Sequence, residues 1–110
     1  MYVSVGCLDL AIDREHRSSA RDVITYAFGN RCDEPAIVDL AAARVHAVAR
    51  DGTVLRIMPF DPRHEIRAMR LDIGATGQEA IAYPSDRQLS MLCVDAASIA
   101  RVHGSRWICF

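Results

Sequence analysis

The stretch RVHAVARDGTVLRIMPF, residues 44–60, decides how the middle of the chain folds. As a hairpin, it turns at Asp51-Gly52, because a two-residue primed turn requires positive φ at both positions. The register that follows pairs His46 with Ile57 and puts apolar residues on both faces, as in an inner strand pair covered on both sides. The hairpin is the interpretation that we favour.

A helix can begin near Asp33, with Pro35 in its first turn. The alternative to the hairpin is that this helix continues to Arg50, with Gly52 just beyond its end. Arg44 would then lie in the middle of the apolar stripe, which counts against this interpretation.

The N-terminal third predicts a strand followed by a helix. Residues 2–12 alternate and are rich in Val, which is typical of a strand, with a bend expected at Gly6. Ser18 or Ser19 can cap a helix over residues 20–28, and Gly29-Asn30 can end it. Five apolar positions share one helical stripe in this segment: Ala20, Val23, Ile24, Ala27 and Phe28.

Further segments have strand patterns: 65–73, 78–84, 89–94 and 106–110. Asp95 is a good N-cap for a helix over residues 96–103, so the chain is expected to end in a strand-helix-strand unit. We therefore predict an α+β fold, a single domain over residues 1–110. Its sheet would be mostly antiparallel, with about five or six strands packed by two or three helices.

Composition narrows the function classes. The 110 residues are 51% hydrophobic and 25% charged, which is typical of a globular domain. The net charge of −1 gives no surplus of cations, so we expect no nucleic-acid partner. The first residues have no signal-peptide pattern and no apolar run approaches the roughly 20 residues that span a bilayer. We expect a cytoplasmic protein without membrane attachment.

The cysteines are spread singly along the chain at Cys7, Cys32, Cys93 and Cys109. They form no C-x-x-C motif and no zinc-finger spacing, and three lie among apolar neighbours. We expect buried free thiols, with disulfide or metal binding as the alternatives, and no metal or cofactor.

Two residues are weak catalytic candidates. Cys32 lies in the polar segment GNRCDEP beside Arg31, where a cation can lower a thiol pKa. His46 can act as a base only with an orienting partner, and the sequence shows none, so a structural role is favoured.

Three segments of mixed charge contain candidate binding residues, because Arg and Tyr are enriched among the residues that anchor protein interfaces. They contribute Arg14, His16, Arg63, His64, Arg67, Tyr83, Asp86 and Arg87. The first hypothesis is a small protein-binding module of the inhibitor, immunity or adaptor type that recognises another protein by its surface. The alternative is a small enzyme or ligand-binding protein with a pocket containing His46 or Cys32. A homodimer is compatible with both hypotheses.

Overall fold

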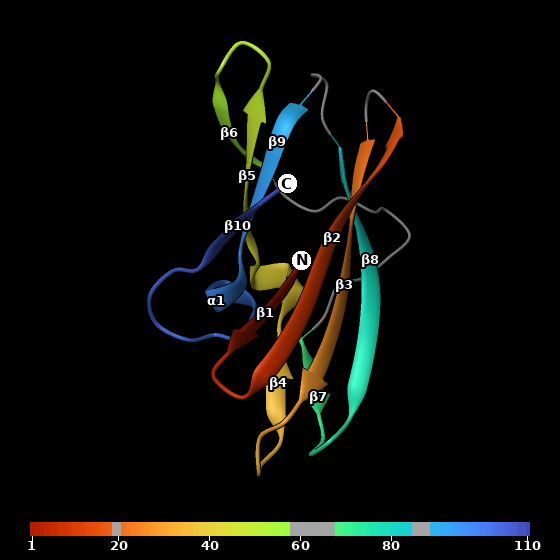
Figure 1. Ribbon diagram of the computed structural model, residues 1–110, viewed down its shortest axis with the longest axis vertical. Coiled ribbons are helices and arrows are strands. Elements are labelled where there is room, and N and C mark those ends of the chain that lie inside the picture. The colour runs from red at the N-terminus through yellow and green to blue at the C-terminus, as the bar shows by residue number, and fades with distance from the viewer. Residues whose placement is uncertain (19–20, 58–67, 85–88) are drawn as a thin grey trace.

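The computed structural model describes residues 1–18, 21–57, 68–84 and 89–110, with the backbone alone at 16–18, 21 and 84. Two four-stranded antiparallel sheets face each other (Figure 1). The first sheet has the order β1 (Tyr2–Val5), β2 (Leu8–Ser18), β3 (Arg21–Asn30) and β8 (Thr76–Pro84). The second has the order β10 (Trp107–Cys109), β9 (Leu89–Asp95), β5 (Arg44–Ala49) and β6 (Val54–Ile57).

The remaining elements are short. A third antiparallel pair joins β4 (Ala36–Val38) to β7 (Met69–Leu71) at one end of the two sheets (Figure 1). A single 3-10 turn, η1 (Leu40–Ala42), and one four-residue helix, α1 (Ala96–Ile99), complete the described part of the chain. The predicted α+β class is therefore wrong: the protein is a β-sandwich, although the expected antiparallel pairing is correct.

The main error is the expected helix over residues 20–28, because its described part, from Arg21 on, lies in strand β3. Ile24, Tyr26 and Phe28 point into the core, while Thr25 and Ala27 point outward, so the same residues also fit a period of two. β3 pairs with β2 on one side and β8 on the other, and this pairing outweighs a local helical stripe.

The hairpin over residues 44–57 is confirmed, and the alternative helix up to Arg50 is wrong. Its register differs by one residue from the predicted one: His46 pairs with Arg56 and not with Ile57, and Val48 pairs with Val54. The loop has three residues rather than two: the backbone N–H of Ala49 donates to the carbonyl of Thr53 at 2.9 Å, and Gly52 has φ 87°. β6 is an edge strand with an exposed outer face.

The ends of the chain also differ from expectation. The expected bend at Gly6, which has φ 61°, is a tight turn that separates β1 from β2. Asp95 caps α1 as predicted, accepting from the N–H of Ala97 at 3.1 Å, but the helix has only one turn. The strands on either side of it, β9 and β10, are antiparallel.

Alternating side chains from both sheets form the core. The bulkiest of its fully buried side chains are Leu10, Ile12, Ile24, Tyr26, Leu40, Tyr83, Leu92 and Ile99. Among the described residues, no helix is long and apolar enough to cross a bilayer.

Candidate binding surfaces

Arg14 lies between the two sheets rather than in an exposed patch. Its guanidinium donates to Asp22 at 2.9 Å and to the carbonyl oxygens of Phe110 and Leu89 at 3.3 and 3.4 Å. Both side chains of the ion pair are largely buried. Arg14 therefore ties β2 to the start of β9 and to the last described residue of the chain, which is a structural task.

Tyr83 is also in the interior. Its hydroxyl lies 2.6 Å from that of Tyr26, and neither ring is exposed. Burial raises the pKa of Tyr83 to about 12, and burial together with the Tyr83 hydroxyl raises the pKa of Tyr26 well above its ordinary value. A tyrosine in this position supports the core and offers no surface to a partner.

The other predicted binding residues stay predictions. Arg63, His64, Arg67, Asp86 and Arg87 lie outside the described residues, as does the side chain of His16.

The expectation of free thiols is wrong. Cys7 is bonded to Cys32, and Cys93 is bonded to Cys109, so no cysteine is free. The sulfur of Cys32 is thus committed to a disulfide and has no thiolate to act as a nucleophile. The even number of cysteines was the one signal for pairing, but four cysteines allow three connectivities and the sequence does not choose among them.

His46 projects from β5 onto the outer face of the second sheet. Its ring stacks on Trp107 of β10, with centroids 4.6 Å apart and an interplanar angle of 27°. In the strand register its neighbours are Cys93 and Arg56, neither of which is a carboxylate that would orient a catalytic imidazole. The contact with Trp107 is a packing interaction.

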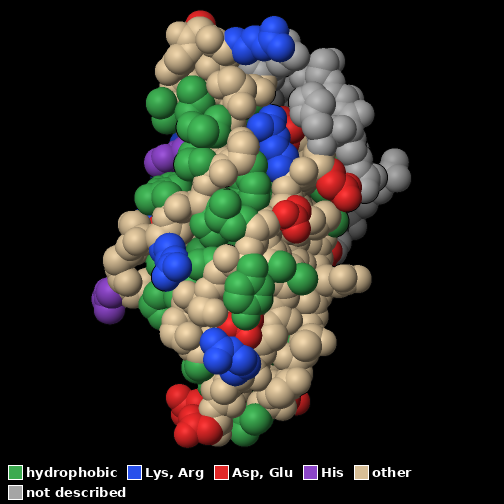
Figure 2. Space-filling model, viewed as in Figure 1, with side chains coloured by type: hydrophobic (Ala, Val, Ile, Leu, Met, Phe, Trp, Pro, Cys, Tyr) green, Lys and Arg blue, Asp and Glu red, His purple; other side chains and the backbone are tan. Residues whose placement is uncertain are grey.

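The outer face of the second sheet carries large apolar side chains. Val54, Met91 and Trp107 are 64%, 37% and 41% exposed, respectively. We call this surface the apolar face and define it as His46, Val48, Val54, Met91, Trp107 and the Cys93–Cys109 disulfide. Figure 2 shows hydrophobic side chains gathered on the side of the molecule where β9 and β10 lie. This surface could not be predicted from the sequence, because Met91 and Trp107 look like core residues until the strands are placed.

A buried carboxylate fixes one end of the apolar face. Asp95 is fully buried and accepts hydrogen bonds from the N–H groups of Ala97 and Arg106 at 3.1 and 2.7 Å. It also pairs with the guanidinium of Arg44, which reaches the carbonyl of Gly104 at 3.3 Å. These bonds hold the segment after α1 against β5 and so position Trp107.

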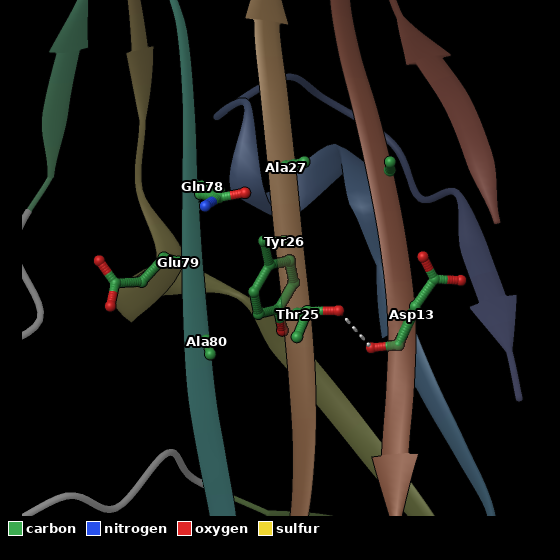
Figure 3. Close-up of a pocket in the computed structure, with 8 residues that line it drawn as sticks. Asp13, Thr25, Tyr26, Ala27, Gln78, Glu79 and Ala80 are labelled. Atoms are coloured by element: carbon green, nitrogen blue, oxygen red, sulfur yellow. Dashed lines mark hydrogen bonds between the residues drawn. The ribbon is translucent and has the colours of Figure 1, made fainter.

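The outer face of the first sheet is hollowed, in contrast to the apolar face (Figure 3). Small side chains form its floor, and two adjoining depressions of about 400 and 410 Å³ lie over them. We call this surface the trough and define it as Ala11, Asp13, Thr25, Ala27, Gly29, Gln78 and Ala80. Thr25 donates from its hydroxyl to the carbonyl of Asp13 at 3.4 Å.

The two faces also differ in charge. Arg44 and Arg56 project beside the apolar face, on which no described carboxylate is exposed. β2 presents Asp9 and Asp13 on the side of the trough, where Figure 2 shows acidic side chains. Arg31 donates to Asp9 at 2.5 Å and lowers its pKa to about 2, and the terminal ammonium of Met1 donates to Asp13 at 2.7 Å.

The described residues contain no group of three or more His, Cys, Asp or Glu side chains that is arranged to hold a metal ion.

Comparisons with known proteins give the fold and nothing further. No family model matches the sequence, and no curated protein is detectably similar to it. Among solved structures, the yjhA protein from Bacillus subtilis superposes with a TM-score of 0.62 over 93% of this chain and 82% of that chain. The two sequences are 9% identical. At that identity the likeness shows a shared fold alone, and this chain is a β-sandwich similar in its backbone to that protein.

Proposed function

We propose that this protein is a binding module that recognises another protein through the apolar face. The observation that supports the proposal is the grouping of Val54, Met91 and Trp107 on one exposed sheet surface. Contiguous exposed apolar patches rimmed by polar groups mark interaction sites, whereas single exposed apolar residues are ordinary. Trp107 has the properties of a binding hot spot, and Arg56 at the rim can pair with a carboxylate on the partner.

Rigidity supports the same proposal. The Cys93–Cys109 disulfide, the stack of His46 on Trp107 and the contacts of Asp95 all restrain the side chains or strands that form the apolar face. A surface that is already ordered loses less conformational entropy when a partner binds.

The disulfides also bear on the compartment. Two bonds that use all four cysteines are typical of proteins in oxidising environments, where disulfides persist. We therefore propose an oxidising compartment as the working environment, in place of the cytoplasm expected from the sequence. The alternative of an enzyme with a His/Cys pocket has less support, since Cys32 is disulfide-bonded and His46 is stacked on Trp107.

The test compares two double variants of the tagged chain, expressed in the organism that encodes it. Val54→Glu with Met91→Glu places charge on the apolar face, and Ile73→Glu with Val102→Glu is a matched control at exposed apolar positions elsewhere. After chemical cross-linking, quantitative mass spectrometry should find a discrete protein with the wild type and the control that is lost with the apolar-face variant. Equal recovery with all three would overturn the proposal.

A further inference from the structure

The outward side chains on the two outer faces of the sandwich differ in size, so that small residues on one face could accommodate large residues of the other. At the centre of the trough the outward residues are Ala11, Ala27 and Gly29, which barely rise above the backbone. Tyr2, which is exposed, lies beside Ala11 at the edge of the trough. On the apolar face the outward residues include Met91 and Trp107, which are among the largest side chains in proteins.

Sheets that pack face to face lie about 10 Å apart, so the side chains of one must fill the space that the other leaves. Large residues packed opposite small ones satisfy this spacing. Two apolar faces would set Met91 and Trp107 against other large side chains. Two troughs would leave much of the space between them unfilled.

Charge favours the same pairing. Arg56 lies at the rim of the apolar face, and the exposed carboxylate of Asp13, which the terminal ammonium of Met1 contacts, lies at the rim of the trough. Arg44 and Asp9 are already paired within the molecule, with Asp95 and Arg31 respectively. Opposite charges across an interface promote encounter and set its orientation, and like charges oppose it. The apolar face thus complements the trough in side-chain size, and Arg56 and Asp13 at their rims are opposite in sign.

We infer that the apolar face binds the trough of a second copy of this chain. This inference rests on the proposed function and names the partner of the same surface. The two surfaces share no residue and belong to the two different sheets (Figure 1), so one molecule can use both at once. Contact between unlike surfaces is heterologous, and it builds a chain of molecules or a closed ring.

Two variants of the full-length chain test the inference by mixing. The apolar-face variant, Val54→Glu with Met91→Glu, keeps an intact trough. The trough variant, Ala27→Arg with Ala80→Arg, keeps an intact apolar face, and its arginines add bulk and repel Arg56. Circular dichroism and thermal unfolding first establish that both variants are folded.

Sedimentation velocity is then measured on each protein and on an equimolar mixture, at concentrations up to about 1 mM. The wild type should form species that grow with concentration, each variant alone should be a monomer, and the mixture should form a heterodimer and nothing larger. The heterodimer should weaken as salt rises, because its exposed charges are screened.

Three outcomes would overturn the inference. The wild type could remain a monomer throughout, the trough variant alone could still dimerise, or the mixture could contain only monomers. The first outcome, combined with loss of a different cross-linked protein in the apolar-face variant, would leave the proposed function standing. If the wild type remained a monomer and the apolar-face variant lost no cross-linked protein, both the inference and the proposed function would be overturned.

Discussion

His46 of β5 stacks on Trp107 of β10 across the intervening strand β9, with ring centroids 4.6 Å apart. The contact joins two strands that do not pair and covers part of the surface between them. Trp107 is the single tryptophan of the chain, so its fluorescence reports on the apolar face without interference.

Removing the imidazole should expose the indole more fully. For His46→Ala we expect a larger acrylamide quenching constant of tryptophan fluorescence, with a loss of unfolding free energy of about 1 kcal/mol, the usual value of an aromatic pair. The control is His103→Ala, which changes an exposed histidine outside the stack. Unchanged quenching in His46→Ala would show that the stack is not populated in solution.

The buried tyrosine pair should show strong coupling. Tyr26→Phe leaves the Tyr83 hydroxyl buried without its partner, which should cost about 1–3 kcal/mol of unfolding free energy. The double variant Tyr26→Phe with Tyr83→Phe removes both hydroxyls, so its loss should be smaller than the sum of the single losses. Urea unfolding of the four proteins measures the coupling, and strictly additive losses would contradict the pairing.

The same pair predicts a pH dependence at the alkaline end. The pKa of Tyr83 is about 12 in the folded protein and that of Tyr26 is also raised, against about 10 in an unfolded chain. The folded state therefore holds these protons more tightly, so the stability they contribute below pH of about 10 should be lost as the pH rises through about 12. Absorbance of tyrosinate, followed with and without urea, measures the difference. Three tyrosines that titrate together near the unfolded value in the folded protein would contradict it.

Gly77 should be less tolerant of substitution than Gly29. A Cβ at Gly77 would lie 2.5 Å from Cε2 of Phe28, whose ring is buried, whereas a Cβ at Gly29 would meet its nearest neighbour, a methyl group of Thr76, at 3.7 Å. Gly77→Ala should therefore lower the unfolding free energy by about 1–3 kcal/mol. Gly29→Ala serves as the control with little change, and equal effects in thermal unfolding would contradict the packing of Phe28.

The disulfides predict both a thiol count and a stability effect. Titration of the denatured protein should find no reactive thiol before reduction and four after it. Replacing Cys93 and Cys109 by Ser should cost about 2–4 kcal/mol, because the bond closes a loop and restricts the unfolded chain. Two or more free thiols before reduction would contradict the pairing.

Part of the fold could be predicted because its signals are local. The Asp51-Gly52 turn and the cap at Asp95 depend on residues adjacent in sequence, and both are present. The register of the hairpin could not be derived in the same way, because Asp-Gly fits both a two-residue and a three-residue loop. That single difference changes which side chains of β6 lie beside β5: Arg56 is opposite His46, in place of the predicted Ile57.

The strand β3 and the disulfides depend on contacts that are distant in sequence. Residues 20–28 fit a helical stripe and also an alternating strand, and pairing with β8, more than 45 residues further along, favours the strand. Cys7 meets Cys32 only because the β1–β2 turn and the end of β3 lie together. The apolar face was missed for the same reason, since hydrophobicity alone does not tell an outward Met91 from a core residue.

The most direct test of recognition by the apolar face is photo-cross-linking in the living host. The photoreactive residue p-benzoylphenylalanine is placed at position 54 or 91, and at the exposed positions 70 and 73 as controls. We predict covalent adducts with one defined partner protein, identified by mass spectrometry, from positions 54 and 91 and none from positions 70 and 73. Absence of an adduct at positions 54 and 91, or equal adducts at all four positions, would contradict the claim.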